Sequence, residues 1–251
     1  MKDALTIAHI GDPQLGFNLN GEDPESKYRE DLARMERVIS EVNRLKPDVA
    51  LISGDMTHKG TAIVRDWPRL HALFTVPVLA TPGNHDMCQR LEREALDRYN
   101  AIFGCDYGTM DVNGWRILFG NTQYWLETDE IKLQTHYEKW LSSELERAKE
   151  LRGKVILAGH NAPFAYRVDE EDGYENCPKS IRFARLDAYL AAGARFYLAG
   201  HMHRLCVRGY RDLTILSAES LSLNFDNRPF GFRVFEVADD FSYSWNFHPA
   251  Q

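Results

Sequence analysis

Short apolar runs alternate along this chain with longer amphipathic segments, and this alternation constrains the fold more than any other feature. The apolar runs are rich in β-branched residues and cover 5–10, 48–53, 76–81, 115–120, 154–159 and 194–200. Runs of this length are typical of strands buried on both faces. The amphipathic segments are 26–46, 88–103, 135–151 and 180–193, with apolar residues at helical spacing. The order predicts an α/β fold with a mostly parallel sheet.

The pattern changes after His203. Residues 213–220 and 231–247 are predicted to form antiparallel strands, with a turn at Asp239 and Asp240. No internal repeat, low-complexity tract or shift in composition marks a linker. We therefore expect one domain over residues 1–251.

Composition excludes several functions. The net charge of -7 gives no electrostatic basis for a nucleic-acid or membrane partner. The four cysteines, Cys88, Cys105, Cys177 and Cys206, are scattered and form no C-x-x-C pair, which favours free thiols in a reducing compartment. The first residues are too polar for a signal peptide, and no run approaches the roughly 18 apolar residues of a membrane span. We expect a cytoplasmic protein.

A polar motif follows each of five predicted strands. In chain order the motifs are GDPQ with Asp12 and Gln14, GD with Asp55, GNHD with Asn84, His85 and Asp86, GH with His160, and GHMH with His201 and His203. The carboxyl ends of parallel strands lie along one edge of a sheet, where ligands bind. These side chains are therefore expected to converge.

The residue types suit metal binding. Aspartates, histidines, an asparagine and a glutamine form a mixed oxygen and nitrogen set that suits divalent first-row metals. The set is too large for one tetrahedral ion and about large enough for two. Asp55 is expected to bridge them, since a shared carboxylate holds two cations ~3.5–4 Å apart. Asp12 alone would more often be a turn residue, but its four partner motifs favour a metal ligand.

The ordered series of motifs, over residues 11–203, resembles the calcineurin-like metallophosphoesterases. The resemblance implies a two-sheet β-sandwich of mixed strands flanked by helices, in four αββα layers, with two metals between the sheet ends. One metal would be held by Asp12, Gln14, Asp55 and His203, and the other by Asp55, Asn84, His160 and His201. His85 would face the phosphate without binding metal, oriented by Asp86.

Gln14 departs from the commonest family pattern, which has histidine there. The sequence resembles a branch that carries DPQ, whose animal members are described as serine/threonine protein phosphatases with a calcineurin-like phosphoesterase domain. The resemblance implies hydrolysis of phosphomonoesters, either phosphoserine and phosphothreonine proteins or small molecules. A metal-bridging hydroxide would attack, and His85 would assist the leaving group. Manganese or iron is favoured over zinc or magnesium.

Two other functions remain open. One is a phosphodiesterase for cyclic nucleotides or related diesters. The other is a catalytically weak scaffold for protein interactions, against which the presence of His85 and Asp86 argues. The long polar loops 17–25 and 164–179 are expected to be functional. In the second loop, Tyr166, Arg167, Tyr174 and Lys179 either border the phosphate entrance or belong to a solvated turn.

The remaining predictions concern histidines outside the motifs. His9 falls within the first strand and is expected to pack in the core, and His58 is near the site without a role in the motif series. The helical and tail histidines, His71, His136 and His248, are expected to be solvated.

Overall fold

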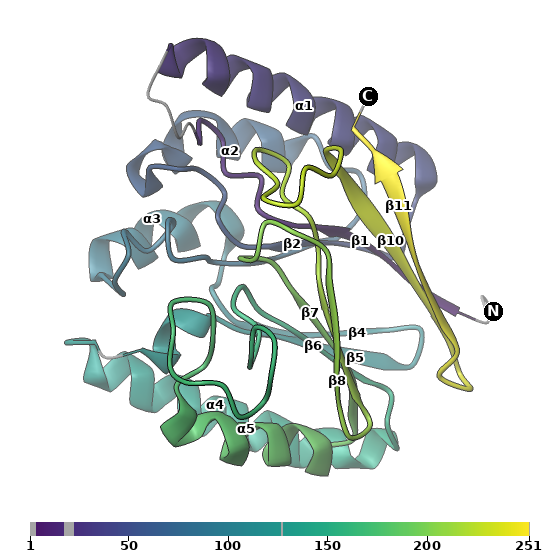
Figure 1. Ribbon diagram of the computed structural model, residues 1–251. Coiled ribbons are helices and arrows are strands. Elements are labelled where there is room, and N and C mark those ends of the chain that lie inside the picture. Colours follow the sequence, from purple (N-terminus) through teal and green to yellow (C-terminus); the bar gives the residue numbers. More distant parts are fainter. Residues whose placement is uncertain (1–3, 18–22, 127, 251) are drawn as a thin grey trace.

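Two β-sheets pack face to face between layers of helices in the computed structural model, which describes residues 4–17, 23–126 and 128–250 (Figure 1). The first sheet has the order β11-β10-β1-β2-β3 and the second β4-β5-β6-β7-β9-β8. Helices α1, α2 and α3 cover the first sheet, and α4 and α5 cover the second (Figure 1). This is the two-sheet α/β sandwich that the family resemblance implied, whereas the apolar pattern alone predicted an α/β fold with a mostly parallel sheet.

The element bounds agree closely with the apolar runs. The strands are β1 Ala4–Ile10, β2 Val49–Ser53, β3 Val78–Thr81, β4 Gly108–Val112, β5 Trp115–Phe119, β6 Val155–Ala158, β7 Ala194–Ala199, β8 Cys206–Tyr210, β9 Leu213–Ser217, β10 Gly231–Ala238 and β11 Tyr243–Pro249. The α-helices are α1 Pro24–Leu45, α2 Ile63–Ala72, α3 Arg93–Phe103, α4 Ile131–Ala148 and α5 Lys179–Ala191. Short 3₁₀ helices cover Gly60–Ala62, Thr122–Trp125 and Lys149–Leu151.

The parallel strands place their carboxyl ends together. β1, β2 and β3 are parallel neighbours in the first sheet, as are β5, β6, β7 and β9 in the second. Antiparallel strands complete each sheet, with β10 pairing β1, β11 pairing β10, β4 pairing β5 and β8 pairing β9. Each predicted metal-binding motif therefore leaves a parallel strand at its carboxyl end.

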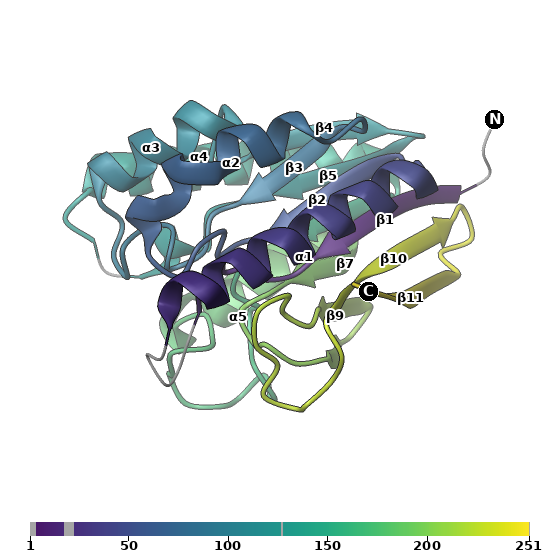
Figure 2. The same cartoon turned by 90° about the horizontal axis from the view of Figure 1, so that it is seen from above.

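Strand β1 is buried on both faces, which explains its nearly continuous apolar run. Leu5 and Ile7 face the second sheet and join the cluster between the sheets, whereas Ala8 and Ile10 join the cluster that includes Met35 of α1. Alternate residues of a strand point to opposite faces, so one short run serves both cores. In Figure 2, seen from above, α1 lies over the first sheet and runs along the line of β1.

Helix α1 begins slightly before the predicted start at residue 26 and ends just before Pro47, as predicted. The carboxylate of Asp23 accepts a hydrogen bond from the backbone N–H of Ser26, and Pro24 occupies the first turn, where its missing N–H costs nothing. At the other end Lys46 adopts a left-handed conformation, and Pro47 prevents the helix from continuing.

Several elements differ from the prediction. Helix α2 was not predicted; it is short and contains Pro68. Residues 88–92 form turns and a short link before α3, because Cys88 and Gln89 have positive φ. The edge strands β4 and β8 were also missed. Strand β9 pairs parallel to β7 as well as antiparallel to β8, whereas β10 and β11 join the first sheet around the predicted turn.

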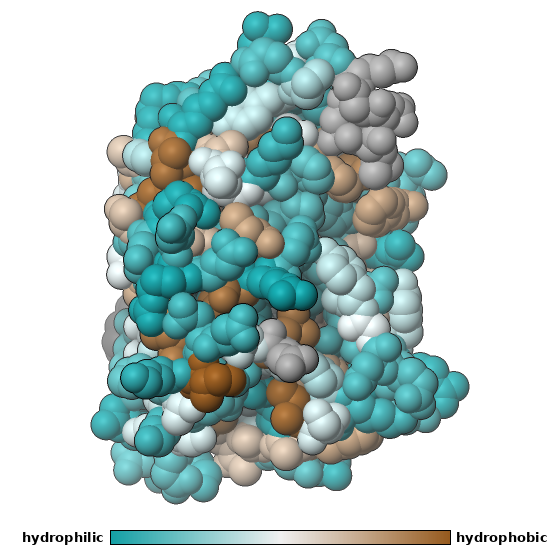
Figure 3. All heavy atoms as spheres, turned by 90° about the vertical axis from the view of Figure 1, so that its left-hand side faces the viewer, coloured by the Kyte–Doolittle hydropathy of each residue, from teal (hydrophilic) through white to brown (hydrophobic). Residues whose placement is uncertain are grey.

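The side of the molecule on the left of Figure 1 is mostly hydrophilic, and hydrophobic side chains reach its surface in small separate groups (Figure 3). Within the described ranges, no helix is long and apolar enough to cross a membrane.

Candidate metal centre

The structure brings the seven predicted metal ligands together at the carboxyl ends of the strands. All seven side chains are buried: Asp12 and Gln14 after β1, Asp55 after β2, Asn84 after β3, His160 after β6, and His201 and His203 after β7. Asp55, His160 and His201 have ligand atoms within 4.8 Å of one another, and so do Asp12, Asp55 and His203. Asp55 belongs to both groups, as a bridging carboxylate would.

Backbone carbonyls fix the tautomers of the three histidines. Nδ1 of His160 lies 2.8 Å from the carbonyl oxygen of Ser53, and Nδ1 of His203 lies 2.8 Å from that of Leu223. Nε2 of His201 lies 3.1 Å from the carbonyl oxygen of Tyr174. A carbonyl only accepts, so each of these nitrogens carries a proton and the other nitrogen of a neutral ring has a free lone pair.

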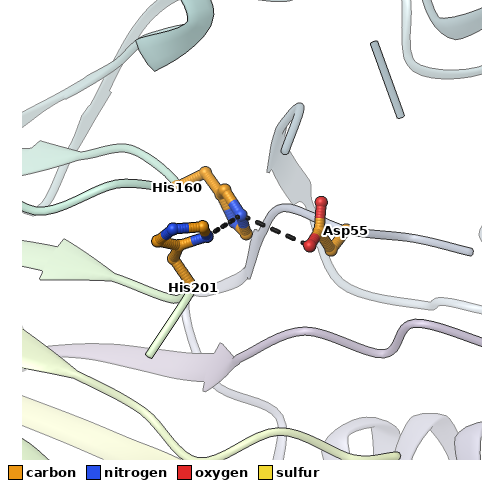
Figure 4. A group of neighbouring side chains, drawn as sticks. All are labelled: Asp55, His160 and His201. Atoms are coloured by element: carbon orange, nitrogen blue, oxygen red, sulfur yellow. Dashed lines mark hydrogen bonds and ion pairs between the residues drawn. The ribbon is translucent and has the colours of Figure 1, made fainter. Parts of the chain in front are cut away.

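The free nitrogens converge on the acidic groups. Nδ1 of His201 is 3.0 Å from Nε2 of His160, and that Nε2 is 3.4 Å from Oδ2 of Asp55 (Figure 4). Nε2 of His203 is 3.6 Å from Oδ1 of Asp12. Ligand histidines whose second ring nitrogen donates to a carbonyl are typical of metal sites.

In the absence of a metal ion, a protonated imidazole supplies the positive charge of the centre. Burial lowers the pKa of His160, but the charge of Asp55 and its hydrogen bond, together with Asp12, outweigh burial and raise it to about 9. Burial and the charge of His160 lower the pKa of His201 to about 3. Burial also lowers the pKa of His203, to about 4. The metal-free cluster therefore holds its positive charge on one imidazole.

The pKa values of the two aspartates shift in opposite directions, although burial acts to raise both. Burial raises the pKa of Asp12 to about 8, despite the opposing charge of His160. Burial acts in the same direction on Asp55, but the charge of His160 and its hydrogen bond prevail, and the pKa of Asp55 falls below its usual value. Cations at this position would favour the charged form of both carboxylates.

The two amide ligands also fit the predicted centre. Nε2 of Gln14 donates to Oδ2 of Asp55 at 3.4 Å, while its buried Oε1 has no hydrogen-bond partner among the described residues. Oδ1 of Asn84 lies 3.0 Å from Nε2 of His160. A buried oxygen without a partner costs free energy unless something binds it, and a cation beside Asp12 and Asp55 would do so.

Most of the candidate ligands have a positive backbone φ angle, which is uncommon for residues other than glycine. Asp12, Gln14, Asp55, His201 and His203 have φ of 38°, 36°, 53°, 68° and 48°. Non-glycine residues in such conformations cost of order 1–3 kcal/mol each and cluster at functional sites. The turns direct side chains from neighbouring strand ends toward one point.

Close packing explains two of the motif glycines. A Cβ atom on Gly83, in GNHD, would collide with the carboxylate of Asp55, and one on Gly200, in GHMH, would collide with that of Asp12. These positions admit only hydrogen because the backbone of one motif lies against the ligand of another.

His85 lies beside the centre, but Asp86 does not orient it. Nδ1 of His85 is 2.7 Å from the carbonyl oxygen of His58, and its backbone N–H donates to Oδ1 of Asp55. The carboxylate of Asp86 accepts from the backbone N–H groups of Met56 and Gly83, both at 2.9 Å. The expected contact is corrected: Asp86 joins the loops after β2 and β3, and burial raises its pKa to about 7.

The histidines outside the motifs lie in different surroundings. His9 is fully buried, with Nε2 3.1 Å from Oγ of Ser53, and burial lowers its pKa to about 3. His58 stacks on Phe17, with ring centroids 4.8 Å apart. His136 is exposed as expected, whereas His71 and His248 are partly buried.

The predicted functional loops have unequal parts in the site. Residues 18–22 of the first lie outside the described residues, and Phe17 contacts the ring of His203 edge-on. In the second, Tyr174 contacts Asn84 and His201. Lys179 pairs with Glu171 and Arg167 with Asp169 at the surface, and the hydroxyl of Tyr166 accepts from Arg204.

Sequence reasoning missed two further neighbours of the ligands. Gln89 accepts from the side chain of Asn84, and Phe225 stacks on His203 at 5.3 Å. Neither lies in a recognisable motif, so no signal in one sequence points to them.

The family model described as calcineurin-like phosphoesterase matches residues 5–205. The chain belongs to this family. It is 25% identical over 243 residues to the serine/threonine-protein phosphatase CPPED1 of Rattus norvegicus, covering 90% of this chain and 78% of the relative. It is 27% identical to a probable cyclic nucleotide phosphodiesterase of Synechococcus, covering 97% and 92%.

A solved dimetal phosphatase from Danio rerio has the same fold, with a TM-score of 0.67 at 13% identity, covering 98% of this chain and 96% of that one. Calcineurin-like phosphoesterases normally bind two divalent metals, and this chain has candidate ligand groups for them. The chain is thus a metal-dependent phosphoester hydrolase.

Proposed function

We propose that this calcineurin-like phosphoesterase is a phosphomonoesterase with two divalent cations, acting on phosphoserine and phosphothreonine proteins or on small phosphomonoesters. The observation that carries the proposal is the position of Asp55 in both groups of converging ligand atoms. The first cation would be held by Asp12, Gln14, Asp55 and His203, and the second by Asp55, Asn84, His160 and His201.

Two cations at such a centre would lower the pKa of a water molecule toward neutrality and offset the charge of a phosphate. The chain holds the ligands rigidly, because the carbonyls of Ser53, Leu223 and Tyr174 fix the three imidazoles. The positive charge of the cations is needed because a protein of net charge -7 would otherwise repel an anionic substrate.

His85 supplies the proton for the leaving group in this proposal. Its Nδ1 is committed to the carbonyl of His58, so transfer from the protonated ring takes place at Nε2. The backbone bond from His85 to Asp55 keeps the residue beside the centre. General acid catalysis of this kind contributes ~10²–10⁴ in rate.

The ligand types suggest unlike metals. An amide oxygen from Gln14 makes the first set harder, which favours manganese or magnesium, whereas His160 and His201 favour iron or zinc at the second. We favour manganese and iron overall.

A phosphodiesterase is the second candidate, and aromatic residues favour it. Phe225 is 51% exposed and stacks on His203, and Phe17 lies 5.5 Å from the same ring. Such rings beside a metal group would accept a nucleobase by stacking. The similarity to the Synechococcus protein points the same way.

A substrate panel distinguishes these candidates. Protein loaded with manganese, iron, zinc or magnesium is assayed on p-nitrophenyl phosphate, phosphoserine and phosphothreonine peptides, bis-p-nitrophenyl phosphate and cyclic AMP. We expect kcat/KM to be highest for monoesters, and the Asp55→Asn variant excludes a contaminating phosphatase. Preference for diesters would select the second candidate, and two bound metals without turnover would indicate a scaffold.

A further inference from the structure

Tyr174 contacts two candidate ligands of the second metal, although it belongs to the loop between β6 and α5. Its carbonyl oxygen lies 3.1 Å from Nε2 of His201, and its ring centroid is 4.9 Å from that imidazole. Its hydroxyl oxygen accepts a hydrogen bond from Nδ2 of Asn84 at 2.6 Å. One residue therefore holds two ligands, through its main chain and its side chain.

The hydroxyl of Tyr174 completes a triangle that orients the amide of Asn84. Nδ2 of Asn84 also donates to Oε1 of Gln89 at 2.9 Å, and the Tyr174 hydroxyl donates to the same oxygen at 3.4 Å. With both amide hydrogens committed, a flip of the amide would break two hydrogen bonds. Oδ1 of Asn84 is thereby held toward Nε2 of His160, where the second metal is proposed.

The loop that carries Tyr174 is braced from within. The carboxylate of Glu170 accepts from three consecutive backbone N–H groups, those of Ala165, Tyr166 and Arg167, and from the side chain of Asn176. Four hydrogen bonds to one carboxylate close this part of the loop into a fixed turn. Glu170 is stabilised as the anion by these donors: burial opposes ionisation, but the pKa falls below its usual value.

The same loop is fixed to α5 by a buried arginine. The guanidinium of Arg182 is fully buried and donates to the carbonyls of Val168, Glu170 and Cys177. An uncompensated buried charge is costly, so this arginine favours the loop shape that supplies these acceptors. The loop is a rigid support that presents Tyr174 to the metal centre.

We propose that Tyr174 is a positioning residue for the second metal alone, with its hydroxyl fixing Asn84 and its carbonyl fixing His201. This inference rests on the proposed dinuclear centre. It assigns the 164–179 loop a part in selective metal retention, because Tyr174 bonds to Asn84 and His201 of the second set, whereas Gln14 bonds to Asp55 and His203 to the carbonyl of Leu223.

The Tyr174→Phe variant tests the hydroxyl and leaves the carbonyl and ring in place. Loss of an outer hydrogen-bond partner typically lowers metal affinity by about 10–100-fold. We expect a loss of about tenfold at the second site and none at the first. Tyr166→Phe is the matched control, since this tyrosine is in the same loop, is 60% exposed against 63% for Tyr174, and bonds to Arg204.

Manganese is titrated into the metal-free wild type and both variants by chelator competition. The His203→Ala variant, which removes a ligand of the first group alone, identifies the binding step that belongs to each site. Electron paramagnetic resonance gives a readout independent of activity, because a pair of bridged manganese ions gives a coupled signal and a single ion does not. We expect Tyr174→Phe to give the single-ion signal at manganese concentrations where wild type and Tyr166→Phe give the coupled one.

Equal affinities in wild type and Tyr174→Phe would overturn the inference. Equal losses at both sites would also overturn it, because the loop would then support the whole centre and not one metal. A wild type that binds fewer than two ions would overturn the dinuclear centre itself, and this outcome is recognised before any variant is compared.

Discussion

Nδ1 of His201 lies 3.0 Å from Nε2 of His160, and the opposite nitrogen of each ring lies against a backbone carbonyl. Neither ring can turn away without losing that hydrogen bond. Two imidazole lone pairs cannot face each other unoccupied, so a proton or a cation must lie between them and the acidic groups. Metal binding at this centre is therefore an exchange of protons for ions.

This exchange predicts that metal affinity rises with pH. In the metal-free chain the pKa of Asp12 is raised to about 8 and that of His160 to about 9, so this neighbouring pair holds protons near neutral pH that an ion must displace. For each proton released on binding, the metal affinity increases by up to about tenfold per pH unit. Chelator competition between about pH 6 and 9 measures the slope; an affinity independent of pH would contradict the assignment.

Asp55→Asn is expected to abolish hydrolysis and to weaken both metal sites. The carboxylate belongs to both groups of ligand atoms, and the amide removes its negative charge. The loss of affinity should exceed the ~10–100-fold caused by removal of an outer partner. Metal analysis after dialysis is the measurement. If the variant retained two ions with normal affinity, Asp55 would not be the bridge.

His85→Ala is expected to keep both metals and to lower turnover by about 10²–10⁴. The backbone N–H that bonds Asp55 remains in the variant, so the ligand set should be undisturbed. The loss should be largest for poor leaving groups, since activated aryl esters need little protonation. His136→Ala, on the exposed face of α4, is the control. A uniform loss across leaving groups would indicate electrostatic positioning instead of proton donation.

Gln14→His is expected to tighten the first site and shift it toward zinc or iron. An imidazole nitrogen would replace the buried Oε1, which has no hydrogen-bond partner among the described residues. Wild type should lose its first metal more readily than its second and respond to added manganese. Metal occupancy and manganese activation are compared side by side in the two proteins. Identical preferences would mean that Gln14 lines the centre without binding an ion.

Most of the buried strands could be predicted from the sequence, because a strand buried on both faces has a nearly continuous apolar run. The apolar runs of β1, β2, β3, β5, β6 and β7 were recognised, and the seven side chains proposed as ligands from the motifs lie close together in the structure. The edge strands β4 and β8 were missed because each has exposed positions that break the apolar run. Helix α2 was missed because Pro68 and its shortness obscure the helical pattern.

The supports of the site were harder to predict than its ligands. Ser53 and Leu223 orient His160 and His203 through their backbone carbonyls. Their side chains therefore give no indication of this role in the sequence. The expected contact between His85 and Asp86 was wrong, because the His85 ring bonds to the carbonyl of His58 and the Asp86 carboxylate accepts from the backbone N–H groups of Met56 and Gly83. Tyr174 was one of four named loop residues, and sequence could not separate it from the others.

The segment around residue 220 has a consequence for how the first metal site is assembled. The hydroxyl of Ser220 and the N–H of Leu221 both donate to the carbonyl of Asp12, and Leu223 fixes His203. Strand β1 also gains its antiparallel neighbour only from residues 231–238. A chain shortened to end at His203 would contain every candidate ligand. Strand β1 would still pair with β2 and the N–H of His201 would still donate to Asp12, but the contacts from residues 220–223 would be missing. The complete first site therefore depends on residues that follow its last ligand in the sequence, and not on the ligands alone.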